Sequence, residues 1–146
     1  MNQMSAQRRT MRPTERSRLH TAALDNDVPT IEALLKAGEV PDIQDVQGFT
    51  PLHMAAQQGS LEAARALLGA GASIEVENSF GNTPLFVAVF NSDGRGELVQ
   101  LLRSHGADPL HANASGQTPV GLARLIANYE VARFFSDLSW VSKCTT

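Results

Sequence analysis

The chain repeats one short motif at intervals of 33 to 35 residues. The segment TPLHMAA begins at Thr50, TPLFVAV begins at Thr83, and TPVGLA begins at Thr118. A glycine precedes each Thr-Pro pair by 12 residues, at Gly38, Gly71 and Gly106. A period of this length is typical of a solenoid, in which each unit buries its apolar side only by stacking on its neighbours. The repeat therefore predicts an all-α solenoid of about four helix-turn-helix units, at residues 17–44, 45–77, 78–112 and 113–136.

Each unit carries the signals of two short helices. A threonine followed by proline suits a helix start, because the hydroxyl accepts a bond from an unpaired backbone N–H and proline needs no donor there. Ser17 has this role in the first unit, where Arg18 replaces proline. Apolar residues at helical spacing predict a second helix, which the repeated glycine ends in the left-handed conformation. The candidate N-caps of the second helices are Asp27, Ser60 and Asn128.

The segments between units have the residue preferences of a tight turn. DVQG begins at Asp45, NSFG at Asn78 and NASG at Asn113. Asp or Asn at the first position and glycine at the fourth are typical of a type I turn. We therefore expect each segment to project as a β-hairpin-like tip ahead of the next helix.

Together these features resemble the ankyrin repeat, over about residues 17–136. The pattern D/N-x-x-G-x-T-P-L-H-x-A-A, with a second helix ending L-L-x-x-G-A, is best preserved in residues 45–77. The terminal units depart from it: the first lacks Thr-Pro, and the last has Val120 and Gly121 in place of Leu-His, with Arg124 at a small-residue position. The resemblance implies a concave surface that binds other proteins. It also implies that His20 and His53 bond the backbone of the next repeat.

No residue pattern indicates catalysis. His105 and His111 flank a turn without a third ligand at matching spacing, so we expect no metal. The Gly-x-Gly at Gly94 follows a helix and lacks the lysine of a phosphate loop. Ser104 and His105 are only sequence neighbours, and the chain has no G-x-S-x-G elbow. We therefore expect no enzymatic activity, no cofactor and no small-molecule substrate.

Composition and charge constrain the setting and the partner. The 146 residues are 42% apolar, without a run of the roughly 20 apolar residues that a membrane span needs. The start lacks an apolar signal segment and Cys144 is the single cysteine, so we expect a cytoplasmic protein without membrane contact. Residues 1–18 hold five arginines against one glutamate, so residues 19–146 carry a net charge of −7. That charge argues against nucleic acid and favours a protein with a basic surface.

The two ends of the chain have separate interpretations. Residues 1–16 are predicted to be a flexible basic arm; a helical extension of the first unit and a contact with nucleic acid or an anionic surface are the alternatives. The tail at 137–146 is predicted to pack on the last unit through Trp140. An exposed Trp140 that anchors a partner is the alternative.

The candidate partner-binding residues lie at the turn tips and at the edges of the first helices. They are Val46, Gln47, Phe49, Gln57, Gln58, Ser79, Phe80, Asn82, Phe90, Asn91, Asp93, Arg95, Ser115 and Gln117. Aromatic residues in exposed positions are typical interface anchors, so Phe49, Phe80 and Phe90 are the main candidates. Packing on adjacent turns is the alternative for them. The third unit has two extra residues within 91–95, which form either a recognition loop or a tolerated insertion.

A narrower resemblance covers residues 83–135. It is carried by TPLFVAVFNSDGRGE from Thr83, GADP from Gly106 and IANYEVARFF from Ile126. These segments resemble small bacterial ankyrin-repeat proteins, many of which are regarded as immunity proteins encoded beside toxins. The resemblance implies that the chain binds and neutralises a cognate toxin, and the acidic body suits a basic one. The alternative is a general ankyrin adaptor or regulatory subunit.

Overall fold

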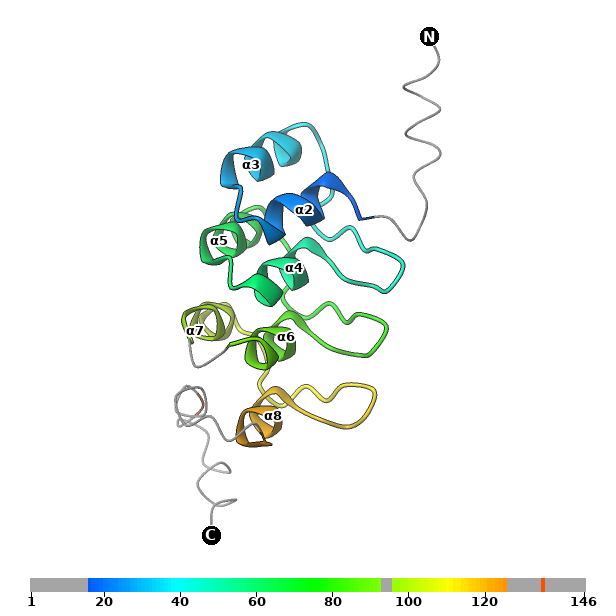
Figure 1. Ribbon diagram of the computed structural model, residues 1–146, viewed down its shortest axis with the longest axis vertical. Helices are drawn as coiled ribbons and strands as arrows, with labels where there is room; N and C mark the ends of the chain where they lie inside the picture. Colours follow the sequence, from blue (N-terminus) through cyan, green and yellow to red (C-terminus); the bar gives the residue numbers. More distant parts are fainter. Residues whose placement is uncertain (1–15, 93–95, 126–134, 136–146) are drawn as a thin grey trace.

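The computed structural model describes residues 16–92, 96–125 and 135, and these form a stack of helix pairs (Figure 1). Its helices are α2 (Arg18–Leu24), α3 (Val28–Lys36), α4 (Pro51–Gln58), α5 (Leu61–Gly69), α6 (Pro84–Phe90), α7 (Glu97–Ser104) and α8 (Pro119–Leu125). The described residues contain no strand. The first helices of the repeats, α2, α4, α6 and α8, stack in one column, and the second helices, α3, α5 and α7, stack in another. The predicted all-α solenoid is therefore confirmed.

The first helices begin at the predicted residues. The hydroxyl oxygens of Ser17, Thr50 and Thr83 each accept a hydrogen bond from the backbone N–H three residues later, at 3.3 Å. Pro51 and Pro84 occupy the first turn of α4 and α6, where no backbone donor is needed. Local sequence signals alone thus define where these helices start.

The second helices are capped less uniformly. Asp27 caps α3 as predicted, because its carboxylate accepts a bond from the backbone N–H of Thr30 at 3.4 Å. The prediction for Ser60 is wrong in part: it lies at the N-cap position of α5, but its side chain does not cap the helix. Its hydroxyl instead donates to the backbone oxygen of Leu24 at 3.1 Å. Carbonyls at a helix end lack partners within the helix, so the end of α2 competes for this donor. Asn128 lies outside the described residues.

The repeated glycines have the conformations that the pattern predicts. Gly38, Gly71 and Gly106 follow the second helices with φ of +100°, +94° and +92°. Each turn is closed at 2.9 Å by a bond from a glycine N–H to a carbonyl oxygen: Gly48 to Asp45, Gly81 to Asn78 and Gly116 to Asn113. At Gly81 the next turn approaches so closely that a Cβ would lie 2.5 Å from the Ala114 nitrogen. This glycine is therefore needed for stacking as well as for its φ of +77°.

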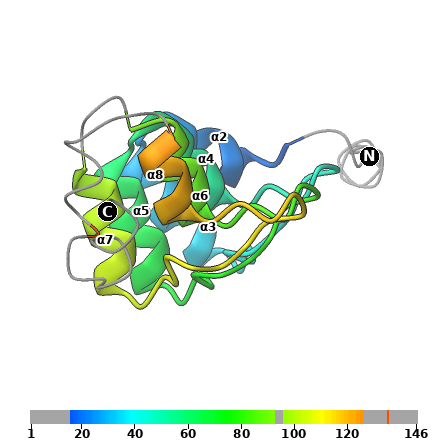
Figure 2. The ribbon, with the colours of Figure 1, turned by 90° about the horizontal axis from the view of Figure 1, so that it is seen from below.

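Successive turns are bonded to one another. The backbone N–H of Ser79 donates to the oxygen of Gln47 at 2.8 Å, and that of Ala114 donates to the oxygen of Phe80 at 3.0 Å. The turns project together to one side of the helices (Figure 2). Small residues aligned on the first helices let these helices pack closely; they are Ala22, Ala55, Ala88 and Ala123, all at most 4% exposed. Among the described residues, no helix has the length and apolar character to cross a membrane.

Candidate functional site

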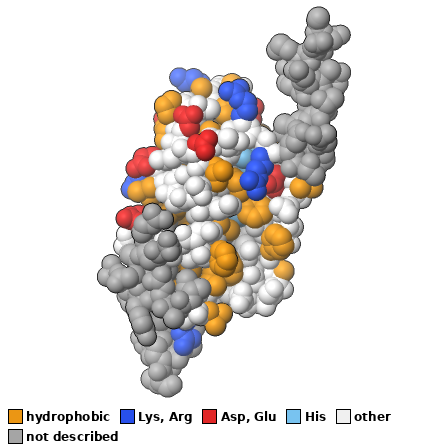
Figure 3. All heavy atoms as spheres, viewed as in Figure 1, with side chains coloured by type: hydrophobic (Ala, Val, Ile, Leu, Met, Phe, Trp, Pro, Cys, Tyr) orange, Lys and Arg blue, Asp and Glu red, His pale blue; other side chains and the backbone are white. Residues whose placement is uncertain are grey.

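A hollow of about 350 Å³ lies between the projecting turns and the first helices α4 and α6. Its lining side chains are aromatic, aliphatic or amide: Phe49, Gln57, Phe80, Asn82, Phe86, Val87, Phe90 and Asn91. We call these eight residues the phenylalanine groove. In Figure 3, hydrophobic side chains gather in the middle of this face, and most of the charged ones lie above them.

Two phenylalanines of the groove are exposed without a structural need. Phe80 in the turn of the third repeat is 53% exposed, and Phe90 at the end of α6 is 65% exposed. The 33-residue period places Gln47 and Gln57 at the corresponding positions of the second repeat. Because the second repeat forms the same turn and helix with glutamine, the fold does not require an aromatic ring at either place. Exposed apolar groups of this kind indicate a binding surface.

Phe49 has a mixed role. Its side chain is half-buried against the core, and its ring contacts the ring of His53 edge-on, with centroids 5.5 Å apart. The guanidinium of Arg16 lies 6.0 Å from the same ring and donates to the carboxylate of Asp45 at 3.1 Å. One side of Phe49 therefore packs on α4 and the core, while its other side borders the hollow.

His20 and His53 have a structural role, because each bonds the backbone of the next repeat. Nε2 of His20 donates to the oxygen of Phe49 at 2.7 Å, and Nε2 of His53 donates to the oxygen of Asn82 at 2.8 Å. The backbone N–H groups of Ser17 and Thr50 donate to the Nδ1 atoms at 3.1 Å, which leaves each ring neutral with its proton on Nε2. Burial lowers the pKa of His53 to about 4 and also lowers the pKa of His20. The expected bonds between repeats are confirmed.

The other candidate residues are distributed along the turns. Gln57, Asn82 and Asn91 line the hollow with the phenylalanines. Exposed residues outside it are Val46, Gln47, Gln58, Ser79, Ser115 and Gln117. Asp93 and Arg95, with most of the predicted insertion, lie outside the described residues. The sequence prediction missed Phe86 and Val87, each 7% exposed at the floor of the hollow. The signal for Phe86 was present, because it replaces the histidine of the repeat.

Three acidic residues that contribute to the net charge of −7 have bonds within the chain. Asp42 accepts bonds from the backbone N–H and the hydroxyl of Ser73, at 2.9 and 2.8 Å. Glu75 accepts the backbone N–H of Asp108 at 2.6 Å, and burial raises the pKa of its carboxyl. Glu77 pairs with Nε2 of His111 at 2.5 Å. None of these side chains lines the phenylalanine groove, so the net charge of the body does not identify the site.

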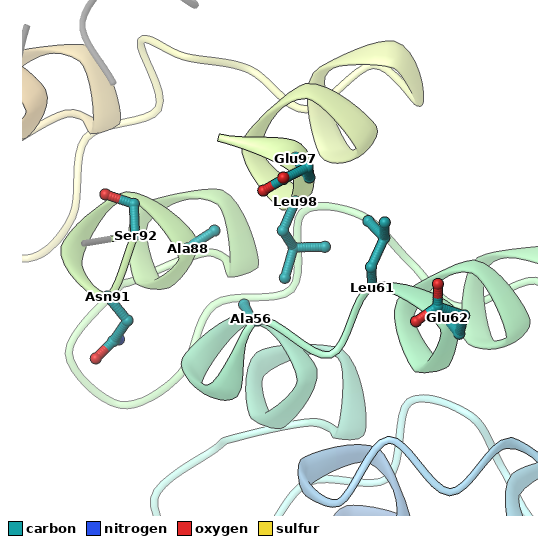
Figure 4. Close-up of a pocket in the computed structure, with 9 residues that line it drawn as sticks. Ala56, Leu61, Glu62, Ala88, Asn91, Ser92, Glu97 and Leu98 are labelled. Atoms are coloured by element: carbon teal, nitrogen blue, oxygen red, sulfur yellow. The ribbon is translucent and has the colours of Figure 1, made fainter. Parts of the chain in front are cut away.

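A second hollow, of about 270 Å³, lies where the first helices lead into the second ones (Figure 4). Its walls combine alanine and leucine side chains with Glu62, Asn91, Ser92 and Glu97. Figure 4 shows Glu62 on α5 and Glu97 on α7, on separate helices. The carboxylate of Glu62 accepts a bond from the side chain of Asn26 at 3.2 Å. Within the described ranges, no group of three or more His, Cys, Asp or Glu residues is arranged to hold a metal ion.

Comparison with known families identifies the repeat. A family model described as ankyrin repeats (3 copies) matches residues 19–113, which is more than half of the chain. A search of curated proteins gives no significant match. The chain therefore belongs to the ankyrin-repeat family. Ankyrin repeats are generally non-enzymatic modules for protein–protein interaction.

Proposed function

We propose that this chain is a protein-binding module that holds its partner in the phenylalanine groove. The observation that carries the proposal is the exposure of Phe80 and Phe90, 53% and 65%, at positions where the preceding repeat has glutamine. Burying apolar surface contributes about 25 cal/mol per Å². Burying the two exposed phenylalanine rings under a partner therefore favours binding. Large buried aromatic groups dominate the energies of interfaces.

The surrounding candidate residues form the rim of the proposed interface. Gln57 and Asn91 offer amide groups beside the rings, and Asn91 is oriented by its own bond to the oxygen of Val87 at 3.0 Å. The turn tips extend the contact surface along the stack through Val46, Gln47, Ser79, Ser115 and Gln117. Gln58, Asp93 and Arg95 belong to the proposed interface on sequence grounds alone. A polar rim around an apolar centre is the usual anatomy of an interface.

Site-specific photo-crosslinking in the host tests the proposal. The full chain would carry p-benzoylphenylalanine in place of Phe90, with replacement of Val40 as the matched control. Val40 is also an exposed apolar residue, at 59%, but it does not line the groove. We expect a discrete cross-linked protein from position 90 and none from position 40.

The cross-linked protein must then bind in a purified system. The double variant Phe80→Glu with Phe90→Glu should weaken its binding about tenfold or more, because two anchors are lost. Val40→Glu should leave the affinity within about twofold, since an exposed residue outside an interface has little effect. Equal affinity of the wild type and the double variant would contradict the proposed site.

More specifically, we propose that the partner is a basic toxin, which the chain neutralises in the cytoplasm. The resemblance of residues 83–135 to immunity proteins and the net charge of −7 over residues 19–146 support this form. Opposite charges on the surrounding surface would speed the encounter. Co-expression with each toxin encoded beside the gene tests it: the wild type should restore growth and the double variant should not. If the wild type restores growth against none of these toxins, the adaptor or regulatory subunit becomes the better description.

A further inference from the structure

The third repeat differs from the second at three positions that meet in space. Phe80, Phe86 and Phe90 stand where the second repeat has Gln47, His53 and Gln57. All three phenylalanines line the same hollow, two at its exposed edge and Phe86 at its floor. Each exchange replaces a polar side chain by an apolar ring. The three phenylalanines therefore make this hollow apolar, while the backbone around it has the same turn and helix as the second repeat.

Among the residues that the structure describes, no charged side chain lines the groove. Five of its eight lining side chains are apolar and the other three are amides. The guanidinium of Arg16 lies 6.0 Å from the ring of Phe49; the Arg16 side chain is 41% exposed, and that of its partner Asp45 is 3% exposed. A carboxylate that enters the hollow would lose its hydration without gaining a partner, and lysine or arginine would gain only the faces of the rings. The groove therefore favours uncharged side chains and disfavours carboxylates most.

The size of the hollow limits the occupant. Its volume of about 350 Å³ is at the lower end for ligand pockets, so it suits one or two large side chains. The amides of Gln57, Asn82 and Asn91 lie around it, and an amide both donates and accepts hydrogen bonds. Such groups match the N–H and C=O groups of a peptide backbone on either side of an inserted side chain.

We infer that the phenylalanine groove recognises an uncharged peptide segment of the partner that inserts a large apolar side chain between Phe49, Phe80 and Phe90. This inference rests on the proposed function and specifies the chemistry of its site. Binding at the groove is driven by apolar burial, and so it depends little on salt. The acidic surface elsewhere affects how fast a basic partner arrives, without contributing to recognition in the groove.

Selection from a display library of random dodecapeptides on the full-length chain tests the inference. The selected peptides should share an aromatic or large aliphatic residue flanked by uncharged residues. Their dissociation constants should change less than about twofold between about 0.05 and 0.5 M NaCl, because screening acts on charges only. Phe80→Glu with Phe90→Glu should weaken them about tenfold or more, whereas Val40→Glu should leave them unchanged.

The possible outcomes separate this inference from the proposed function. Peptides that need Phe80 and Phe90 but are rich in lysine and arginine, with strong salt dependence, would overturn the inference and leave the groove as the binding site. Selected peptides that are indifferent to the double variant, or a library without any ligand for the groove, would also overturn it. In that case the cross-linking experiment decides whether the groove binds a folded surface instead.

Discussion

The junction between the second and third repeats is bonded differently from the junction between the third and fourth. At the first of these, the buried ring of His53 joins α4 to the oxygen of Asn82 at 2.8 Å. At the second, Phe86 occupies the histidine position and its side chain has no donor to offer. The oxygen of Asn82 and the corresponding oxygen of Gln117 also accept a backbone N–H within their own turn: Asn82 that of Asn78 at 3.0 Å, and Gln117 that of Asn113 at 2.8 Å. At these two oxygens, the difference between the junctions is therefore the histidine bond alone.

Polar contacts between the turn at Asn113 and the turn at Asn78, and between the residues just before these turns, lie nearer to solvent. The side-chain amide of Asn113 donates to that of Asn82 at 2.8 Å, and His111 pairs with Glu77. The His111 and Glu77 side chains are 25% and 50% exposed, so water weakens their attraction. The third repeat thus has an apolar groove floor in place of a buried polar bond between repeats. Under the proposed function, Phe86 forms the floor of the binding groove in addition to its place in the core.

Removing the buried histidine should have the largest effect. His53→Ala takes away a fully buried ring and leaves the Thr50 N–H without its acceptor and the Asn82 oxygen without its second donor. We expect a loss of about 3 to 4 kcal/mol in the free energy of unfolding, measured by urea titration. Phe86→Leu, which keeps an apolar residue at the same position, should cost less than about 1.5 kcal/mol. Equal losses would mean that the two junctions do not differ as described.

The next largest effect should come from acid, which lowers the stability that the buried histidines give to the stack. Burial lowers the pKa of His53 from 6.5 to about 4, so between these pH values the unfolded chain binds a proton that the folded chain does not. Stability should therefore be independent of this group above about pH 6.5 and fall as the pH drops toward 4, by up to about 3 kcal/mol. The burial of His20 acts in the same direction. Urea titrations at several pH values, compared with those of His53→Asn, isolate the contribution; an unchanged slope in the variant would contradict it.

Substitutions at Gly81 and Gly59 separate the effect of turn stacking on stability from the effect of the left-handed backbone conformation. Gly81 and Gly59 have similar φ values, +77° and +74°, but only Gly81 has a neighbour where a Cβ would lie. Gly59→Ala should cost about 1 kcal/mol from the left-handed conformation. Gly81→Ala should cost about 2 kcal/mol or more, because it also separates Ala114 from Phe80. Thermal unfolding of both variants gives the difference, and equal melting temperatures would show that the turns do not need this close approach.

The ion pair of His111 with Glu77 should matter least. His111→Ala removes the contacts with Glu77 at 2.5 Å and with Glu75 at 3.7 Å. Because these groups are partly exposed, we expect a loss of about 0.5 kcal/mol in urea titrations. A loss as large as that of His53→Ala would mean that this exposed pair stabilises the stack as much as the buried histidine bond does.

Short-range signals along the chain are enough to predict the local structure and the order of the repeats. Thr50 with Pro51 starts α4 and Gly48 closes the turn before it, because capping and turn signals act over three or four residues. The period then requires that these units stack. The same reasoning singled out Phe80 and Phe90, whose exposure follows from their positions in the repeat.

How the side chains of different repeats meet depends on the packing of the whole stack. It directed the Ser60 hydroxyl to Leu24 instead of its own helix, and it brought Phe86 to the floor of the groove. It also placed Asp42, Glu75 and Glu77 in bonds with neighbouring repeats and kept them out of the groove. These contacts join residues about 30 to 40 positions apart, and their distances depend on how each turn is set against the helices beside it. That spacing is a property of the packed stack, and no short-range signal encodes it.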